Sequence, residues 1–173
     1  MCGIAGFVNF QKNLTGYNKV IELMTDTLKK RGPDSHGYYI SKNALLGHRR
    51  LIVVDPKGGN QPMIKLHNGK KYIIVYNGEL YNTEDVRKLL IKAGYTFDSY
   101  SDTEVLLTAY IHWGKDCLKH INGIFAFGVY SENDEKTFSC QRPTWCKTFI
   151  LYLKRSQSYI WFRNKNPSCK SFG

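Results

Sequence analysis

The residues Met1-Cys2-Gly3-Ile4-Ala5-Gly6 open the chain, and the cysteine in second position governs how the rest is interpreted. Residues 3–10 alternate small and apolar side chains, which is typical of a β-strand, and Cys2 would lie at the leading edge of that strand. Methionine before a small residue is normally removed. We therefore expect Cys2 to become the first residue of the mature chain.

A cysteine at the first position combines a soft nucleophile with a free α-amine. A thiol and an α-amine both titrate near neutral pH, so the amine can take and return protons for the thiol. An amine placed in this way activates a nucleophile without a separate histidine base. Cys2 could instead be a small buried hydrophobic residue, which is a common role for free cysteine. The dipeptide alone favours this structural role, so the decision depends on the other blocks of sequence.

Those blocks resemble, in content and order, the N-terminal glutaminase domain of the glutamine-hydrolysing asparagine synthetases. This domain is a class II glutamine amidotransferase with an N-terminal nucleophile. The resemblance runs from Met1 to about Phe138. It rests on Met1–Gly6, Arg31–Asp34, Gly47–Leu51, Gly59–Pro62, Tyr76–Asn82, Ser101–Val105 and Gly123–Phe127. Each block is a weak match by itself, and the ordered set favours the catalytic role for Cys2.

The hydrophobic pattern predicts an α+β protein. Helical spacing predicts helices over 17–28, before Gly32-Pro33, and over 83–93. A third begins at the capping-box pattern of residues 101–104 and ends near 114. Short strands are predicted at 36–40, 44–47, 50–54, 71–76 and 124–130. This order suits a sandwich of two sheets with helices outside, and the resemblance implies a four-layer αββα N-terminal-nucleophile hydrolase sandwich, here C-terminally incomplete.

The resemblance implies that Cys2 attacks the side-chain amide of L-glutamine, which gives a glutamyl thioester and ammonia, and that water then releases glutamate. The side-chain amide of Asn77 and the backbone N–H of Gly78 would hold the negative oxygen of each tetrahedral intermediate. Asn-Gly is also a strong signal for a hairpin turn. The position of this pair between the strand at 71–76 and the next helix favours the oxyanion role.

Arg50 matches the arginine that binds the glutamine α-carboxylate in this family, a task suited to a guanidinium fork. Arg49 would point to the opposite face of a strand, and we expect it to be a solvated charge. Leu51 and Val53 are expected to line the pocket. The family usually has serine after this leucine, whereas this chain has Ile52.

Asp102 and Glu79 match the family positions that bind the glutamine α-ammonium. Asp102 has an alternative role, because an acidic residue in the first turn of a helix is stabilised by the helix dipole. We expect His48 to be structural, since the α-amine already supplies a base. Arg31 and Asp34 are expected to fix a loop near the nucleophile.

The charge of the chain is concentrated at its end. The 173 residues carry a net charge of +11, yet residues 139–173 hold seven Lys or Arg and no Asp or Glu. A net charge of this size suggests a nucleic-acid partner at first sight, but its concentration in the last fifth of the chain does not favour one. The five cysteines are an odd number with no CxxC pair, so neither a disulfide framework nor a metal site is expected.

The segment after Phe138 departs from the family run Leu-Ala-Arg-Asp-Arg-Leu-Gly-Val-Lys-Pro. A DNA sequence that can encode residues 139–152 gives this run when it is read one base later, and Trp145 before Cys146 must then become glycine. We expect a domain over 1–138 and an out-of-frame tail over 139–173 with no native fold. A truncated product of this kind could also be inactive.

No apolar run is long enough to cross a membrane, and we expect a cytoplasmic protein. The family uses ATP and Mg in a separate synthetase domain, whose Ser-Gly-Gly-x-Asp-Ser run is absent from these residues. No cofactor is therefore expected in this chain, although full-length members can be homodimers. Amidotransferases of the glucosamine-phosphate or purine pathways are the alternative family, but they usually have His-Thr-Arg-Trp where this chain has His48-Arg49-Arg50-Leu51.

Overall fold

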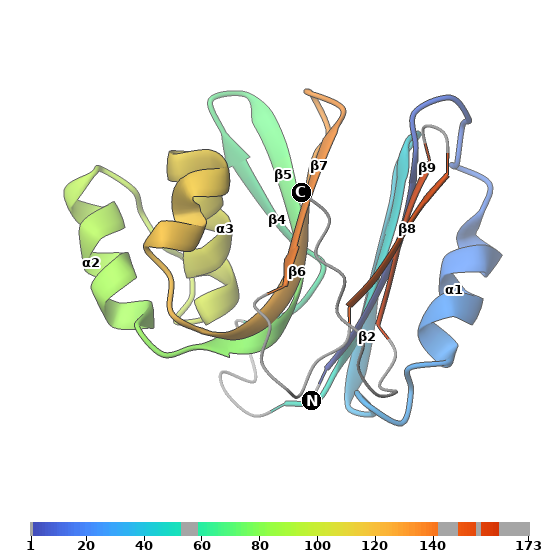
Figure 1. The fold of residues 1–173 in the computed structure, drawn as a ribbon, viewed down its shortest axis with the longest axis horizontal. Coiled ribbons are helices and arrows are strands. Elements are labelled where there is room, and N and C mark those ends of the chain that lie inside the picture. The colour runs from blue at the N-terminus through green and yellow to red at the C-terminus, as the bar shows by residue number, and fades with distance from the viewer. Residues whose placement is uncertain (1, 53–58, 142–148, 155–156, 163–173) are drawn as a thin grey trace.

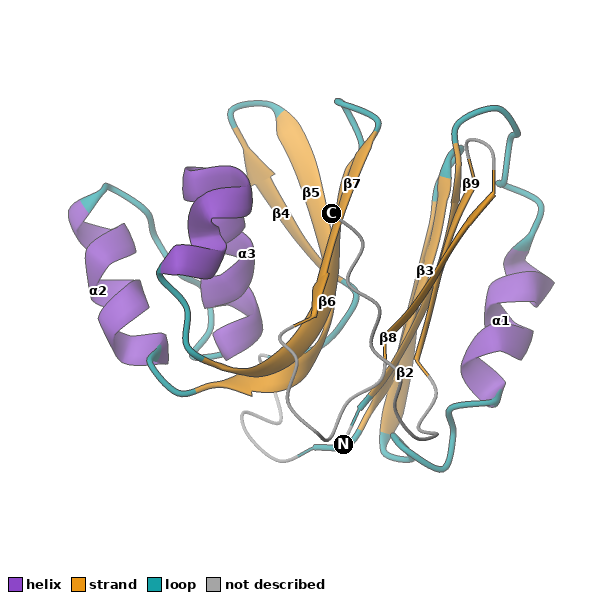
Figure 2. Ribbon diagram, viewed as in Figure 1, coloured by secondary structure: helices purple, strands orange, loops and turns teal. Residues whose placement is uncertain are grey.

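The computed structural model describes residues 2–52, 59–141, 149–154 and 157–162, with side chains up to residue 141. Its elements form four layers, in the order helices, sheet, sheet, helix (Figure 1). Helices α2 and α3 cover one outer face and α1 covers the other (Figure 2). The α+β class and the αββα layering predicted from the sequence are confirmed.

The first sheet has the strand order β2-β3-β1-β9-β8. Its strands are β1 (Gly3–Asn9), β2 (Ser35–Ile40), β3 (Ala44–Arg50), β8 (Phe149–Lys154) and β9 (Gln157–Phe162). Strand β1 lies between β3 and β9 and pairs antiparallel with both. The strand that follows Cys2 therefore occupies the middle of the sheet, where both of its edges are hydrogen-bonded.

The second sheet has the order β4-β5-β6-β7. It comprises β4 (Met63–His67), β5 (Lys70–Leu80), β6 (Gly123–Ser131) and β7 (Lys136–Gln141). The pairing is antiparallel throughout. Strand β5 is long, and its last residues continue past the end of β4 while they remain paired with β6. This extension carries Asn77 and Gly78.

Three helices form the outer layers. They are α1 (Asn18–Asp26), α2 (Thr83–Lys92) and α3 (Asp102–Trp113), the last followed by a 3₁₀ turn, η1 (Gly114–Lys119). Ser101 caps α3 by accepting a hydrogen bond from the Thr103 N–H at 3.1 Å. Glu104 does not complete the predicted capping box, because its carboxylate accepts from the Ser99 N–H at 2.8 Å and pairs with Lys65 at 2.7 Å.

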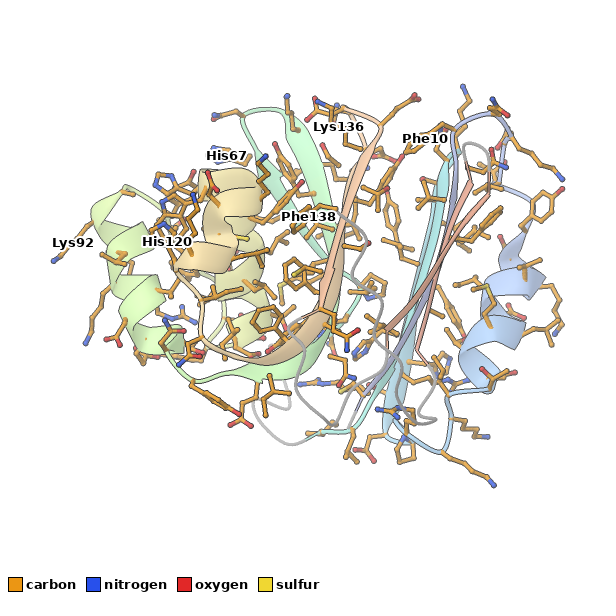
Figure 3. The ribbon with its side chains drawn as sticks, in the orientation of Figure 1. Phe10, His67, Lys92, His120, Lys136 and Phe138 are labelled. Carbon is orange, nitrogen blue, oxygen red and sulfur yellow. The ribbon has the colours of Figure 1, made fainter. Side chains whose placement is uncertain are left out.

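Alternation along the strands produces a core on both sides of each sheet. One apolar cluster lies between the sheets, with members Ile4, Val8, Ala44, Leu46, Ile73, Val75, Ala126 and Tyr130. The alternate residues of the same strands pack outwards against the helices, as Ala5 and Leu45 do toward α1. Phe138 packs on the opposite side of the second sheet, where its ring stacks on Tyr110 of α3 with centroids 5.3 Å apart (Figure 3).

Two strand predictions are wrong in their bounds. The sequence predicts separate strands at 44–47 and 50–54, whereas β3 is one strand from Ala44 to Arg50. His48 and Arg49 continue its pairing with β1 on one side and β2 on the other, so the ladder does not break at Gly47. The predicted strand at 71–76 likewise extends to Leu80.

Strand β7 spans the predicted domain boundary at residue 138, and β8 and β9 lie in the segment expected to be out of frame. Residues 149–154 (FILYLK) and 157–162 (QSYIWF) are rich in β-branched and aromatic residues, which favour strands. Strand pairing does not report the origin of a sequence. The frame shift therefore stays a prediction.

Candidate active site

The candidate site lies where the apolar layer between the two sheets ends and polar residues replace it. On β3, Ala44 and Leu46 face the other sheet, so the period of two places His48 and Arg50 on that same inner face. On β5, Ile73 and Val75 face inwards in the same way, and Asn77 is the next residue on that face. Two strands far apart in the chain thus direct polar side chains toward the interlayer space.

Arg50 is buried, with 5% of its surface exposed, and its guanidinium donates to the Asn60 side-chain oxygen at 3.2 Å. A buried guanidinium on the inner face of β3 suits the predicted carboxylate-binding role, which stays a prediction. Arg49 faces α1 instead, as predicted, but it is not solvated. Its side chain is 9% exposed and is paired with Asp26 at the end of α1. The expectation of a solvated Arg49 was wrong because α1 covers that face of β3.

The Cys2 thiol lies against the backbone of Leu51. The Leu51 N–H donates to Sγ at 3.4 Å, and Sγ lies 3.6 Å from the Leu51 carbonyl oxygen. Arg31 Nε donates to the Cys2 carbonyl at 3.3 Å. Cys2 is half-buried, so the alternative of a fully buried structural cysteine does not describe its position.

The loop before β2 holds this region together, as expected for Arg31 and Asp34. The Asp34 carboxylate accepts from the Ile52 N–H at 2.7 Å, a bond to the backbone that does not depend on the side chain at residue 52. A Cβ on Gly32 would lie 2.3 Å from the Arg49 carbonyl carbon and 2.6 Å from the Arg50 nitrogen. Glycine is therefore required there for the loop to pack on the backbone that carries Arg50.

Asn77 and Gly78 lie inside β5, opposite Ala126 and Phe125 of β6. The alternative of a hairpin turn at this Asn-Gly pair is excluded. Asn77 is 2% exposed. A Cβ on Gly78 would lie 2.6 Å from Cε2 of Tyr76 and 2.8 Å from the Phe125 Cα. The glycine is thus required by its own sheet. Its role as an oxyanion donor stays a prediction.

Asp102 begins α3 and is held by two donors. Its Oδ2 accepts from the Tyr76 hydroxyl at 2.8 Å and from the Leu80 N–H at 3.3 Å. The pKa of Asp102 is raised above its usual value, mainly by burial and to a lesser extent by the nearby Glu79 charge. The hydrogen bonds from Tyr76 and Leu80 oppose this shift. Burial also raises the pKa of Tyr76 well above its usual value. Glu79 itself is exposed at the end of β5, and Val53 lies outside the described residues.

His48 is buried between Arg50 and the interlayer core, with 1% of its surface exposed. The pKa of His48 is lowered to about 4, mainly by burial and also by the Arg50 cation, while a hydrogen bond with the Tyr76 backbone acts in the opposite direction. Its Nε2 is buried with no hydrogen-bond partner among the described residues. A neutral imidazole at this depth agrees with the structural role that we expected.

Gln61 belongs to the Gly59–Pro62 block, and the sequence alone predicts no role for it. Its side-chain oxygen accepts from the Tyr76 N–H at 2.6 Å, and its amide nitrogen donates to Thr103 Oγ1 at 3.2 Å. Tyr76 also had no assigned role, although its hydroxyl reaches Asp102. The only signal for these two residues was their place in the ordered blocks, since both functions depend on contacts between distant segments.

This geometry combines a half-buried thiol at the start of a central strand with a buried guanidinium and a carboxylate in an αββα sandwich. That combination is typical of N-terminal-nucleophile amidotransferases. The enzyme described as the allosteric regulatory enzyme of purine biosynthesis has this fold, with a TM-score of 0.73 and 18% identity over 92% of this chain and 41% of that one. Glutamine phosphoribosylpyrophosphate amidotransferase from B. subtilis matches with a TM-score of 0.66 and 17% identity, over 92% of this chain and 41% of that one.

A family model described as glutamine amidotransferase domain matches residues 1–165, and the chain belongs to this family. Asparagine synthetase [glutamine-hydrolyzing] 3 of Bacillus subtilis is 48% identical over 160 residues, which is 92% of this chain and 26% of the relative. Asparagine synthetase B of Escherichia coli is 36% identical, over 92% of this chain and 28% of the relative. The chain thus spans about a quarter of the length of these curated relatives. Among the described residues, no helix is long and apolar enough to cross a membrane.

Proposed function

We propose that this chain hydrolyses L-glutamine to glutamate and ammonia through a thioester on Cys2. The observation that carries the proposal is the position of the Cys2 thiol, half-buried against Leu51 one residue beyond the buried Arg50. We infer that the Arg50 guanidinium, on the residue before Leu51, binds the α-carboxylate and directs the other end of a five-carbon amide toward the thiol.

The reaction has two steps. The thiol sulfur attacks the amide carbon while its proton passes to the α-amine, which is free once Met1 has been removed. The tetrahedral oxygen is held by the Asn77 amide and the Gly78 N–H. The C–N bond then breaks, the leaving nitrogen takes the proton, and ammonia departs. Water attacks the thioester in the second step, which releases glutamate and restores the thiol.

Recognition of the free amino acid uses two opposite charges at one end of the pocket, because the α-carboxylate and the α-ammonium are bonded to the same carbon. Arg50 binds the α-carboxylate, and Asp102 with Glu79 binds the α-ammonium. The support for Asp102 is that two donors fix its carboxylate at the end of β5. Leu51 and Val53 are proposed to line the space between these charges and the Cys2 thiol, where the side chain of glutamine would lie.

In the longer relatives the same domain would supply ammonia to an acceptor. Because these relatives are asparagine synthetases, we propose that the full-length protein makes asparagine from aspartate. That step would use ATP and Mg in a synthetase domain separate from these residues. The thioester chemistry requires a reduced thiol, and among the described residues Cys2 and the buried Cys117 are reduced thiols. This favours a reducing compartment such as the cytoplasm.

The test is ammonia and glutamate release by the 173-residue chain, with Cys2→Ala as the inactive variant. Cys117→Ala is the matched control, because burial, with a smaller effect of Cys140, raises the pKa of Cys117 to about 12 and keeps it protonated. We expect Cys2→Ala to abolish release and Cys117→Ala to retain it. Mass spectrometry of the purified chain checks that Met1 is removed. Glutamine hydrolysis by Cys2→Ala would refute the proposal.

A further inference from the structure

Gln61, Tyr76, Asp102 and Thr103 form a closed ring of contacts beside the site. Gln61 accepts from the Tyr76 N–H at 2.6 Å, and the Tyr76 hydroxyl donates to Asp102 at 2.8 Å. Asp102 is bonded covalently to Thr103, and the Thr103 hydroxyl accepts from Gln61 at 3.2 Å. The ring joins three segments of the chain: the residues before β4, the middle of β5 and the first turn of α3.

The ring begins where regular pairing stops. Strand β4 pairs with β5 only as far as Met63 opposite Ile74. The N–H of Tyr76, two residues further along β5, therefore has no β4 backbone opposite it, and the Gln61 side chain supplies the acceptor. An amide side chain can do this while its nitrogen still donates elsewhere, because it carries an acceptor and two donors. Gln61 uses that second capacity on Thr103.

The ring acts on Asp102 from both sides. Through Tyr76 it sets the hydroxyl that donates to the carboxylate, and through Thr103 it fixes the turn of helix from which the carboxylate projects. Thr103 is 2% exposed and Tyr76 is 3% exposed. Water therefore cannot easily replace these hydrogen bonds, and a buried group that loses its partner destabilises the fold. Loss of Gln61 would leave the two β5 donors of Asp102 in place, but it would remove the side chain that joins the Tyr76 backbone to the first turn of α3.

We propose that Gln61 is a positioning residue that holds Asp102 at the place where the α-ammonium of the substrate binds. The inference rests on the proposed function and deepens it, since it assigns part of the preference for an α-amino acid to a residue that does not touch the substrate. Displacement of a binding group by about 1 Å can reduce a rate by about a hundredfold, so the expected effect is about tenfold to a hundredfold.

The test compares L-glutamine with glutaramate, which has the same amide and carboxylate but lacks the α-amino group. In Gln61→Leu we expect kcat/KM for L-glutamine to fall about tenfold to a hundredfold and that for glutaramate to change less than about threefold. Thr103→Val should behave similarly, and Thr103→Ser, which keeps the hydroxyl, should restore the preference. Gln11→Leu, in an exposed turn, is the matched glutamine control and should leave both values unchanged.

Alkylation of Cys2 by iodoacetamide provides a readout that is independent of substrate recognition. Its rate should change less than about twofold in Gln61→Leu, because the Leu51 N–H donates to the thiol and Arg31 donates to the Cys2 backbone carbonyl, and neither contact involves Gln61. Equal loss on both substrates with slower alkylation would show general disruption and overturn the inference. An unchanged preference would also overturn it. Failure of the unaltered chain to hydrolyse either amide would instead refute the proposed function and remove the basis of the inference.

Discussion

Gly78→Ala separates two reasons for a glycine at the candidate oxyanion position. If the glycine serves only the substrate, the variant should fold normally and lose activity. The structure gives a different reason. A Cβ at residue 78 would lie 2.6 Å from Cε2 of Tyr76, 2.7 Å from the Ile124 carbonyl oxygen and 2.8 Å from the Phe125 Cα. Two of these three atoms belong to the backbone of β6.

The size of the effect follows from those contacts. Ordinary van der Waals contact begins near 3.4 Å, so the three atoms lie 0.6–0.8 Å too close. A ring could rotate away, but the two backbone atoms can move only if β5 and β6 separate. Overpacking of this kind costs about 1–3 kcal/mol, and one weakened ladder hydrogen bond adds about 1 kcal/mol. We expect Gly78→Ala to lose about 2–4 kcal/mol of unfolding free energy.

The measurement is urea unfolding followed by far-UV circular dichroism. Gly16→Ala is the matched control, since no atom lies within 4 Å of a Cβ built there, and reduced freedom of the unfolded chain should stabilise it by about 0.4–1 kcal/mol. A Gly78→Ala midpoint equal to that of the unaltered chain would refute the packing argument. Glutaminase activity in a stable Gly78→Ala would refute it as well.

His48→Gln should weaken the loss of stability in acid. The folded-state pKa of His48 is lowered to about 4, so the unfolded chain binds a proton at His48 first, and this residue makes stability fall as the pH drops from about 6.5 toward 4. Urea midpoints of the two proteins at pH 7.5 and pH 5 measure the difference. A pH dependence as steep in the variant would contradict a buried neutral imidazole. Asp26→Ala should lower the free energy of unfolding by about 1–3 kcal/mol, because it leaves the buried Arg49 guanidinium without its partner. The control Glu22→Ala removes a pair with Lys19 whose side chains are 80% and 42% exposed, and it should change stability by less than about 1 kcal/mol. Equal effects in thermal melts would show that the burial of Arg49 is unimportant. Tyr76→Phe should move the acid limb of the pH profile of kcat/KM for glutamine to higher pH. The Tyr76 hydrogen bond lowers the pKa of Asp102, so its loss should raise that pKa. An unmoved limb would argue against Asp102 as a substrate-binding carboxylate.

The chemical groups of the candidate site could be predicted from sequence because their blocks are local. Cys2 at the start of an alternating strand, Arg50 in its block and the acidic start of α3 each depend on a few neighbouring residues. Alternation and helical spacing predicted which faces of each element are apolar, and the order of strands and helices suited two sheets with helices outside, whereas the four-layer αββα arrangement was implied by the resemblance. The resemblance supplied the roles of these groups.

The environments of the same residues depended on segments far away in the chain. Whether Asn77-Gly78 forms a turn or a strand was decided by β6, which pairs with both residues. Whether Arg49 is solvated was decided by α1, whose last residue, Asp26, lies 23 positions away and pairs with it. The bounds of β3 depended in the same way on its two neighbouring strands.

The sequence by itself thus determined the candidate nucleophile, the charged groups and the alternation that buries one face of each strand, because these properties belong to single residues and their near neighbours. Only the tertiary structure decided the burial of Arg49, the strand conformation of Asn77-Gly78 and the ring through Gln61. Each of these depends on hydrogen bonds or packing between residues that become neighbours only when the two sheets and their helices come together. A local pattern carries no information about which distant donor will meet a given acceptor.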